Sequence, residues 1–272
     1  MQTKNFNYQS SNIFYRVIGS GKQVLLIHGF GEDGEIWNNQ EAFLKAHYQL
    51  IIPDLPGTGH SDLIADMSIE GMCEVIKEII TIELQQLPLQ KVAGVSVIGH
   101  SMGGYITLAL AEKYPQLLTA FGLVHSSAFS DDATKIITRT KAIEFIKSNG
   151  ALAFLKTSIP GLFSEEWLST HQNEVHTLVQ KATQFSAEAL TKYYQAMIAR
   201  PDRTSVLKSF PRAILFIIGE HDKAVPFEQS MRQSSLMDHT YLHILHKSAH
   251  MGMLEEQDKV NTVVLAFLQG AT

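Results

Sequence analysis

A serine in a glycine-rich turn is the strongest sign of chemistry in this sequence. Gly99, Ser101 and Gly103 form the pattern G-x-S-x-G, between an apolar run at 92–98 that predicts a strand and a helical stretch at 102–114. A sharp turn from strand to helix exposes the serine hydroxyl, and the chain passes so close that the flanking positions are glycine. The first N–H groups of the following helix favour negative charge that develops beside them. The pattern predicts a nucleophilic serine; the alternative is a glycine-rich turn that merely contains one.

A serine nucleophile needs a base, and the base needs a carboxylate that holds it in one tautomer. When the serine stands in such a turn, the acid and then the histidine follow it along the chain. Asp222 follows an apolar run at 213–218, and His250 lies in a loop after another run at 241–245. Ligands of parallel sheets bind at the carboxyl ends of the strands, where all three side chains can converge. We therefore expect Ser101 to be the nucleophile, Asp222 the acid and His250 the base.

Other candidates for the acid and the base lie close by. Glu220 is an alternative acid, although it stands closer to the predicted strand, and Asp222 could be only a turn or cap residue. His243 and His246 are alternative bases, but their spacing of three on a strand turns them to opposite faces, which also disfavours a joint metal site. The single cysteine, Cys73, excludes an internal disulfide and a cysteine-based zinc site. We expect no metal and no organic cofactor.

The same chemistry needs backbone donors for a developing oxyanion and a pocket for the substrate. One donor is expected to be the N–H of Met102, directly after the serine, and the other the N–H of Phe30, after an apolar run at 24–27. Two side chains are candidates for the pocket: His125, at the end of a predicted strand, and Trp167, near the start of a predicted helix. The alternatives are a buried, hydrogen-bonded histidine and a tryptophan that only packs helices together.

The elements that must position these residues alternate between apolar strands and helices. The predicted strands are 24–27, 49–53, 92–98, 117–124, 213–218 and 241–245, and the predicted helices are 72–87, 102–114, 134–148, 165–185, 187–200, 226–236 and 254–268. Continuous apolar strands separated by helices are typical of a mostly parallel, doubly wound α/β sheet that is covered on both faces. Residues 128–208 carry only helical patterns. We therefore predict a core of 1–127 and 209–272 with an inserted helical cap at 128–208.

Five motifs in this order resemble the α/β-hydrolase fold family. They are Leu26–Phe30, Asp54 with Gly57–Ser61, Gly99–Gly104, Gly219 with Asp222 and Val225–Pro226, and His250–Gly252, and they extend over essentially the whole chain. The resemblance implies a carboxylesterase-like enzyme with Ser101 as nucleophile, Asp222 as acid and His250 as base, and with Phe30 and Met102 as oxyanion donors. It implies the hydrolysis of a small carboxylic ester, thioester or lactone through an acyl-enzyme.

Several other functions remain as alternatives. A serine nucleophile disfavours the haloalkane dehalogenases and epoxide hydrolases of this fold, which use aspartate. A menaquinone-pathway lyase usually carries arginine where this chain has Tyr105. A carbon–carbon bond hydrolase and a non-catalytic ligand receptor stay open. The segment 29–34 imitates the dinucleotide pattern G-x-G-x-x-G, but Glu32 and Asp33 would repel a pyrophosphate, so an NAD(P) oxidoreductase is disfavoured.

Composition limits the partners. The 272 residues carry 22 Lys and Arg against 27 Asp and Glu, a net charge of −5, without the basic stripe of nucleic-acid-binding domains. No apolar run approaches the roughly 20 residues of a membrane span. The polar start has no apolar segment typical of a signal peptide. We expect a cytoplasmic monomer or homodimer that acts on a small acyl substrate, with neither nucleic acid nor membrane as partner.

Overall fold

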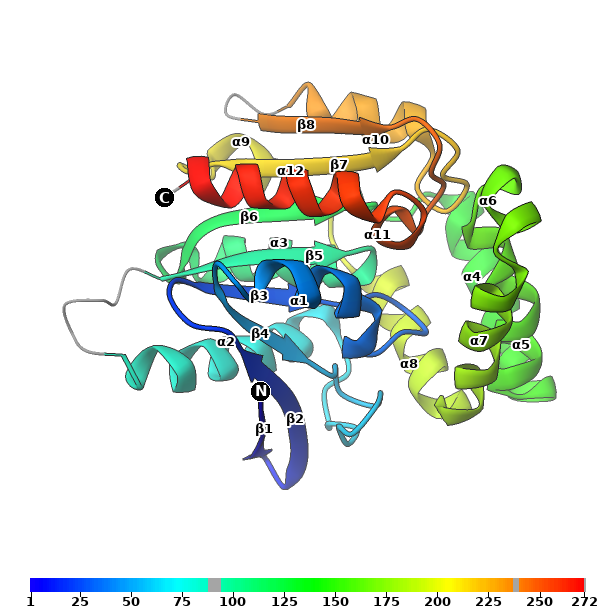
Figure 1. The fold of residues 1–272 in the computed structure, drawn as a ribbon. Coiled ribbons are helices and arrows are strands. Elements are labelled where there is room, and N and C mark those ends of the chain that lie inside the picture. The colour runs from blue at the N-terminus through cyan, green and yellow to red at the C-terminus, as the bar shows by residue number, and fades with distance from the viewer. Residues whose placement is uncertain (88–93, 237–239, 272) are drawn as a thin grey trace.

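The computed structural model describes residues 1–87, 94–236 and 240–271. Its centre is an eight-stranded sheet in the order β1-β2-β4-β3-β5-β6-β7-β8 (Figure 1). The strands are β1 (Gln2–Tyr8), β2 (Ser11–Ile18), β3 (Gln23–Ile27), β4 (Gln49–Pro53), β5 (Val95–His100), β6 (Leu118–Val124), β7 (Ile214–Gly219) and β8 (Thr240–Leu245). All neighbours from β4 to β8 pair in parallel, and β2 runs antiparallel to both β1 and β4. The predicted α/β architecture is confirmed.

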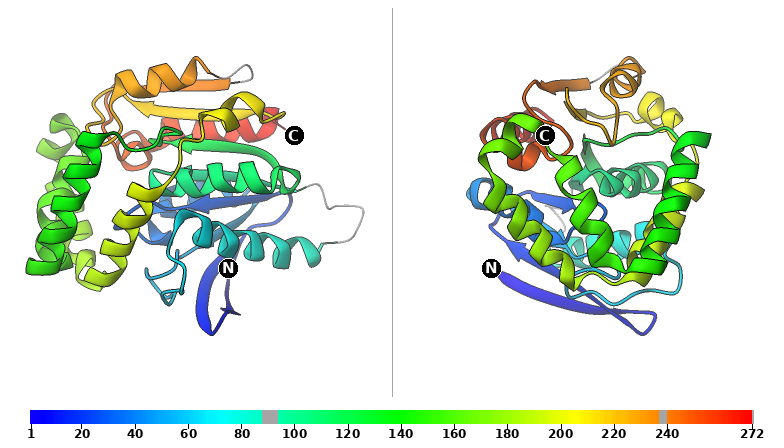
Figure 2. Two further views of the ribbon diagram at one scale, coloured as in Figure 1. Left: turned by 180° about the vertical axis from the view of Figure 1, so that it is seen from behind. Right: turned by 90° about the vertical axis from the view of Figure 1, so that its right-hand side faces the viewer.

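Helices cover both faces of the sheet, as its apolar strands require. The helices are α1 (Asn38–Leu44), α2 (Ile69–Gln85), α3 (Met102–Lys113), α4 (Ala133–Asn149), α5 (Ala151–Ser158), α6 (Glu165–Thr170), α7 (Gln172–Lys181), α8 (Ala187–Ala199), α9 (Thr204–Ser209), α10 (Phe227–Ser234), α11 (Gly252–Glu255) and α12 (Gln257–Gly270). Helices α2, α3, α9 and α10 pack on one face, and α1 and α12 pack on the other. The two views of Figure 2 show these layers from further directions.

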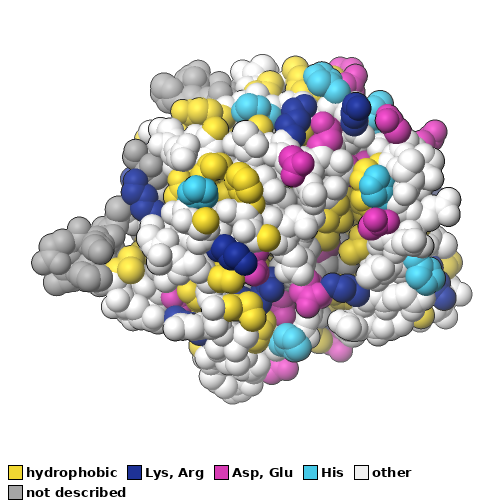
Figure 3. Space-filling model, viewed as in Figure 1, with side chains coloured by type: hydrophobic (Ala, Val, Ile, Leu, Met, Phe, Trp, Pro, Cys, Tyr) yellow, Lys and Arg dark blue, Asp and Glu magenta, His cyan; other side chains and the backbone are white. Residues whose placement is uncertain are grey.

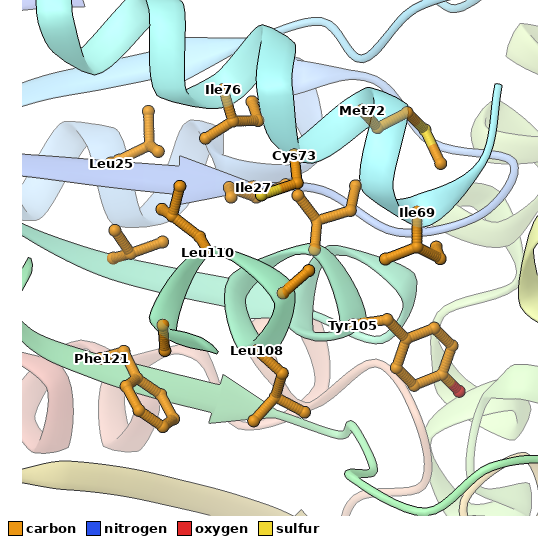
Figure 4. Packing of buried hydrophobic residues seen from close by; sticks show 14 of the residues in the cluster. Leu25, Ile27, Ile69, Met72, Cys73, Ile76, Tyr105, Leu108, Leu110 and Phe121 are labelled. Carbon is orange, nitrogen blue, oxygen red and sulfur yellow. The ribbon is translucent and has the colours of Figure 1, made fainter. Parts of the chain in front are cut away.

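Side chains that alternate along a strand feed two separate hydrophobic clusters. Leu25 and Ile27 of β3 belong to the cluster of α2 and α3, whereas Val24 and Leu26 belong to the cluster that contains α1 and α12. Cys73 of α2 lies beside Ile27 in this packing (Figure 4). Burial raises the pKa of the Cys73 thiol to about 12, so this cysteine acts as a small apolar side chain.

The helices between β6 and β7 form a separate layer beyond the carboxyl ends of the strands. Residues 128–208 contain no strand, and α4 to α8 stand opposite that edge of the sheet (Figures 1 and 2). Helix α9 lies against α3 instead, with Val206 and Leu207 in the cluster of that face. The boundaries of the cap at 128 and 208 stay a prediction.

One buried carboxylate ties this layer to the sheet. The Asp131 carboxylate accepts hydrogen bonds from Arg139 Nε of α4 at 2.7 Å and from Arg200, just after α8, at 2.9 Å. The Arg200 guanidinium lies 3.9 Å from the centre of the Tyr105 ring in α3. Helices α4 and α8 are thus joined through Asp131 and Arg200 to α3, the helix that follows the candidate nucleophile.

The sequence missed some elements and placed others imperfectly. The hairpin of β1 and β2 was not predicted, although β2 alternates the buried Ile13, Tyr15 and Val17 with less buried residues, whereas β1 has no buried residue. Helices α1, α5 and α9 were also missed. The predicted helix 165–185 is broken at His171, whose backbone lies outside the helical region (φ −123°, ψ 38°). The first residues of the predicted strand 92–98 lie outside the described residues.

The surface agrees with the charge balance of the sequence. On the face shown in Figure 3, Lys and Arg side chains are interspersed with Asp and Glu rather than gathered into one patch. In the part of the chain that the structure describes, no helix has the length and apolar character needed to cross a membrane.

Substitution of one buried and one exposed phenylalanine tests which side chains belong to the hydrophobic core. Phe121 of β6 is fully buried, and its ring centre lies 4.7 Å from that of Phe210, whereas Phe145 of α4 is 41% exposed. We expect Phe121→Ala to lower the free energy of unfolding by about 3–5 kcal/mol, because it removes buried contacts and leaves a cavity. Phe145→Ala should cost about 1 kcal/mol or less. Urea denaturation measures both, and equal losses would contradict the assignment.

Candidate active site

The chain turns sharply at Ser101, between β5 and α3. Ser101 has φ 50° and ψ −115°, a left-handed backbone that is strained for a residue with a side chain. Its N–H donates to the carbonyl of Val124 at the end of β6, at 2.9 Å. A Cβ atom at Gly103 would lie 2.4 Å from the carbonyl oxygen of Ile27 in β3. The turn therefore fits only because this flanking residue is glycine, as the sequence pattern predicts.

The structure brings the three predicted catalytic side chains together. Ser101 Oγ lies 2.9 Å from His250 Nε2, and His250 Nδ1 lies 2.8 Å from Asp222 Oδ2. The other carboxylate oxygen, Asp222 Oδ1, accepts hydrogen bonds from the N–H groups of Ala224 and Val225, each at 2.8 Å. The carboxylate is thereby fixed in orientation, and the three groups form a continuous hydrogen-bonded chain from acid to hydroxyl.

The electrostatic environment suits an ionised acid next to a base. Burial alone would raise the pKa of Asp222, but the imidazoles of His250 and His125 outweigh it and hold that pKa well below its usual range. Burial alone would lower the pKa of His250, but the charge and hydrogen bond of Asp222, with a smaller contribution from Glu32, raise it above its ordinary value of 6.5. The imidazolium form of His250 is therefore stabilised at this position.

A second carboxylate and a second histidine support the same residues. Glu32 Oε2 accepts a hydrogen bond from the N–H of Gly29 at 2.6 Å and lies 3.0 Å from His100 Nδ1. His100 Nε2 in turn lies 3.0 Å from the backbone carbonyl oxygen of His250. Sequence reasoning missed this network. Only the acidic residue inside the glycine pattern 29–34 could have indicated it.

The candidate oxyanion donors flank the serine. Met102 is the first residue of α3, and Phe30 lies in the loop after β3, where a Cβ atom at Gly29 would stand 3.1 Å from Ser101 Cβ. Among the described backbone hydrogen bonds outside helices and strands, none starts from the N–H of Phe30 or Met102. Their role as oxyanion donors stays a prediction.

The loop after β4 is hydrogen-bonded to the loop after β3, which contains Phe30. Asp54 Oδ1 accepts from the N–H of Gly34 and Asp54 Oδ2 from the N–H of His60, each at 2.9 Å. The N–H of Leu55 donates to His28 Nε2 at 2.9 Å. These bonds connect the loops that follow β3 and β4.

A cavity of about 210 Å³ is lined by Phe30, a predicted oxyanion donor, and by Met251, the residue after His250. Its apolar lining includes Phe30, Leu155, Ile159, Leu162, Phe185 and Tyr194. Glu32, Asp33 and Glu35 also line it, and Lys181 of α7 pairs with Glu35 across its edge. The cavity thus lies between the core and the helical layer, and its walls are apolar with an acidic side.

The two predicted pocket residues lie elsewhere. Trp167 does not line this cavity; its ring is stacked between Phe163, at 4.6 Å, and His171, at 4.3 Å. This placement matches the alternative of a tryptophan that packs helical segments. His125 is buried behind Asp222, with its Nδ1 3.5 Å from Asp222 Oδ2, and it does not line the cavity either. A role of either residue in substrate binding stays a prediction.

The alternative acid and bases are not in this cluster. Glu220 pairs with His246 at 2.6 Å, and both side chains are well exposed. His243 lies on β8 and is half-buried.

The residues His125, Asp222 and His250 could also present ligand atoms to a metal ion, since these atoms lie within 4.8 Å of one another. Two of the three atoms already share the 2.8 Å hydrogen bond between acid and base. The arrangement fits the proton-transfer chain directly.

Comparisons with known proteins identify relatives of this chain. The model of the alpha/beta hydrolase family matches residues 24–263. An uncharacterized protein of Mycobacterium tuberculosis H37Rv is 30% identical over 149 residues, which are 54% of this chain and 41% of that protein. This chain therefore spans less than half the length of that relative.

Two further relatives align over nearly their whole length. A putative carbamate hydrolase of Pantoea ananatis is 24% identical, with 94% of this chain and 93% of that protein covered. A 2-hydroxy-6-oxononadienedioate/2-hydroxy-6-oxononatrienedioate hydrolase of Pseudomonas putida is 26% identical, with 94% and 92% covered.

Solved structures share the fold at low identity. A thermophilic esterase of Thermogutta terrifontis has a TM-score of 0.90 at 23% identity, with 100% of this chain and 99% of that chain covered. The enol-lactonase of Burkholderia xenovorans has a TM-score of 0.86 at 20% identity, with 98% and 100% covered.

The pair of Glu32 and His100 predicts a pH-dependent stability. Burial alone would raise the pKa of Glu32, but His100 and the N–H of Gly29 lower it below 4.5. A carboxyl group with a lowered pKa stabilises the folded state above its ordinary pKa, and this stabilisation is lost as the pH falls through the folded value. At about pH 7, Glu32→Gln should cost about 1.5–3 kcal/mol, the value of a hydrogen bond to a charged group.

Urea denaturation at about pH 7 and about pH 4 measures this difference, which should shrink at the lower pH. Glu188→Gln is the control, because Glu188 is exposed and makes only an i,i+4 pair with Lys192, which predicts a change of less than about 0.5 kcal/mol. A Glu32→Gln effect that stayed constant over this range would show that the charge of Glu32 is unimportant.

Proposed function

The chain belongs to the α/β hydrolase family, and we propose that it is a serine hydrolase that cleaves a small carboxylic ester, thioester or lactone. The observation that carries the proposal is the chain of short contacts from Asp222 through His250 to Ser101, at 2.8 and 2.9 Å. A serine hydroxyl is a weak nucleophile until an adjacent base accepts its proton. The proposed catalytic residues are therefore Ser101, His250 and Asp222.

In the first step Ser101 Oγ attacks the carbonyl carbon of the substrate while His250 Nε2 takes the hydroxyl proton. The electron pair of the carbonyl moves onto its oxygen, which the N–H groups of Phe30 and Met102 stabilise. Asp222 stabilises the imidazolium. When the tetrahedral intermediate collapses, the bond to the leaving group breaks and His250 gives its proton to that group, which leaves an acyl group on Ser101.

Water then repeats the sequence on the acyl-enzyme. His250 accepts a proton from the water, whose oxygen attacks the acyl carbon, and the bond to Ser101 Oγ breaks as His250 returns the proton to the serine. The products are a carboxylic acid and an alcohol or thiol, or a hydroxy acid from a lactone. These steps use only groups of the chain and water.

The size of the cavity supports a small substrate. A volume of about 210 Å³ is below the usual range for sites of drug-sized ligands, and its mostly apolar lining suits a short acyl or alkyl group. Ser101 and His250 do not line this cavity, but Phe30, a proposed oxyanion donor, and Met251, which follows His250 in the chain, do.

A carbon–carbon bond hydrolase is the second candidate. The observation in its favour is the full-length similarity to the Pseudomonas putida hydrolase, at 26% identity. The same serine, base and acid would serve such a reaction. The substrate that is turned over distinguishes the two candidates.

The first test is the hydrolysis of p-nitrophenyl esters of graded acyl length by the wild type and by Ser101→Ala. We expect the variant to lose at least about 10⁴-fold in kcat/KM, because the nucleophile is removed. The chain length with the highest kcat/KM should be short. Ser148→Ala is the control, because Ser148 is an exposed residue near the end of α4.

Full turnover by Ser101→Ala would refute the mechanism. If the wild type cleaves no ester of any length, a fluorophosphonate probe and a meta-cleavage product separate the remaining cases. A probe that labels Ser101, together with cleavage of the meta-cleavage product, would select the carbon–carbon hydrolase. Turnover of neither substrate would leave a ligand receptor.

The pH dependence of kcat/KM provides a further test. His250 must be neutral to accept the proton of Ser101, and its pKa is raised above 6.5 by Asp222. Activity should therefore be low at acidic pH and rise through a midpoint above 6.5. Asp222→Asn should lower kcat by roughly 10⁴-fold, because the base loses its ionised partner. A flat profile between about pH 5 and 8 would exclude His250 as the base.

A further inference from the structure

His125 is a buried histidine that the proposed reaction does not use. It follows β6 directly, is 1% exposed, and has a φ of 49°, in the left-handed region that few residues other than glycine adopt. Its N–H donates to the carbonyl of Ile217 in β7 at 2.9 Å, which holds the backbone there. Strain of this kind persists where the surrounding structure fixes the position of a side chain.

The surroundings of His125 determine where its proton lies. The N–H of Gly252 donates to His125 Nε2 at 3.2 Å, so this nitrogen is an acceptor. A Cβ atom at position 252 would stand 2.4 Å from Nε2, so only glycine allows this contact. Burial lowers the pKa of His125 to about 4, which keeps the ring neutral near pH 7. The single proton is therefore on Nδ1.

That proton faces the acid. His125 Nδ1 lies 3.5 Å from Asp222 Oδ2 and has no hydrogen-bond partner among the described residues. The same oxygen accepts the 2.8 Å hydrogen bond from His250 Nδ1. A buried donor without a partner is rare and calls for an explanation. Here the donor stands beside the oxygen through which Asp222 acts on the base.

We propose that His125 is a positioning residue for Asp222, one that keeps Oδ2 aimed at His250 and donates to Oδ2 when the His250 ring tilts toward the leaving group. This inference rests on the proposed function. A donor beside Oδ2 withdraws part of the negative charge that His250 feels. His125 therefore limits how strongly Asp222 stabilises the imidazolium, and so sets the pH at which the base becomes neutral.

Other charged groups also act on His250 and must stay constant in a test. They are Asp222 after β7, Glu32 after β3 and Lys135 on α4, and the ring of His100 at the end of β5 also lies 5.0 Å from the ring of His250. None of them is altered by a substitution at position 125, so a shift of the pH profile in such a variant reports on His125.

Two substitutions at this position separate the donor from the ring. Glycine and asparagine both tolerate a positive φ, so neither adds backbone strain. His125→Gly removes the donor, whereas His125→Asn places an amide N–H where Nδ1–H stands in the wild type. His243→Asn, on β8 and outside the site, is the matched control.

We expect His125→Gly to lose about tenfold in kcat with short p-nitrophenyl esters, which corresponds to one hydrogen bond. The acidic limb of its kcat/KM profile should move up by roughly half a pH unit, because His250 then faces the full charge of Asp222. His125→Asn should restore most of the rate and the wild-type limb. His243→Asn should match the wild type.

The proposal is overturned if His125→Gly has the kcat of the wild type and the same acidic limb of the kcat/KM profile. Equal losses of kcat in the glycine and asparagine variants, with an unchanged acidic limb of the kcat/KM profile, also overturn it, because a merely structural role produces that result. If His125→Gly does not fold, His125→Asn decides. A wild-type pH profile of kcat/KM supports the proposal. A tenfold loss of kcat with an unchanged acidic limb overturns it.

A measurement without substrate separates this proposal from the proposed function. The downfield proton resonance of His250 Nδ1 should shift in His125→Gly and return in His125→Asn. An unchanged resonance overturns the positioning role whatever reaction the protein catalyses. If the wild type shows no turnover that depends on Ser101, the proposed function is overturned. The proton resonance of His250 Nδ1 then still tests the positioning role of His125.

Discussion

The left-handed turn at Ser101 is the constraint on which the arrangement of the site depends. It is held from two sides. The N–H of Ser101 donates to the carbonyl of Val124 at the end of β6, and Ser126 Oγ, just after β6, donates to the carbonyl of Ser101. On the other side, Gly103 lies directly against the end of β3. The turn can form only where parallel strands end together and leave room for the hydroxyl between them. Every other group of the site is placed with respect to this point.

Two buried carboxylates, Asp222 and Glu32, hold His250 in place from two directions. Asp222 orients the ring of His250 through Nδ1, and His100, paired with Glu32, holds the backbone carbonyl of the same histidine. Each carboxylate also accepts backbone N–H groups, so neither is left without partners. A buried carboxylate is tolerated only under such conditions, and the same contacts lower the pKa of Asp222 and Glu32. The hydrogen bonds that stabilise these buried carboxylates are thus the same ones that the proposed proton transfer requires.

The helical layer encloses the space in front of this site. Asp131 and its two arginines join the layer to α3, and Lys181 pairs with Glu35 on the side of α7. The cavity between layer and core receives its apolar side chains largely from the layer and its acidic ones from the loop after β3. In the proposed function the core would supply the reacting groups, whereas the inserted helices would shape the pocket.

The sequence by itself determined the architecture and led to the three residues that we propose to react, because both follow from local patterns. Apolar runs identify parallel strands, glycine spacing identifies the turn at Ser101, and strand ends locate Asp222 and His250. Only the tertiary structure revealed the contact of Glu32 with His100, the position of His125 beside Asp222, the stacking of Trp167 and the break at His171. Each of these depends on atoms that are distant in the sequence, and residue types along one chain do not reveal which of them will meet across the edge of a sheet.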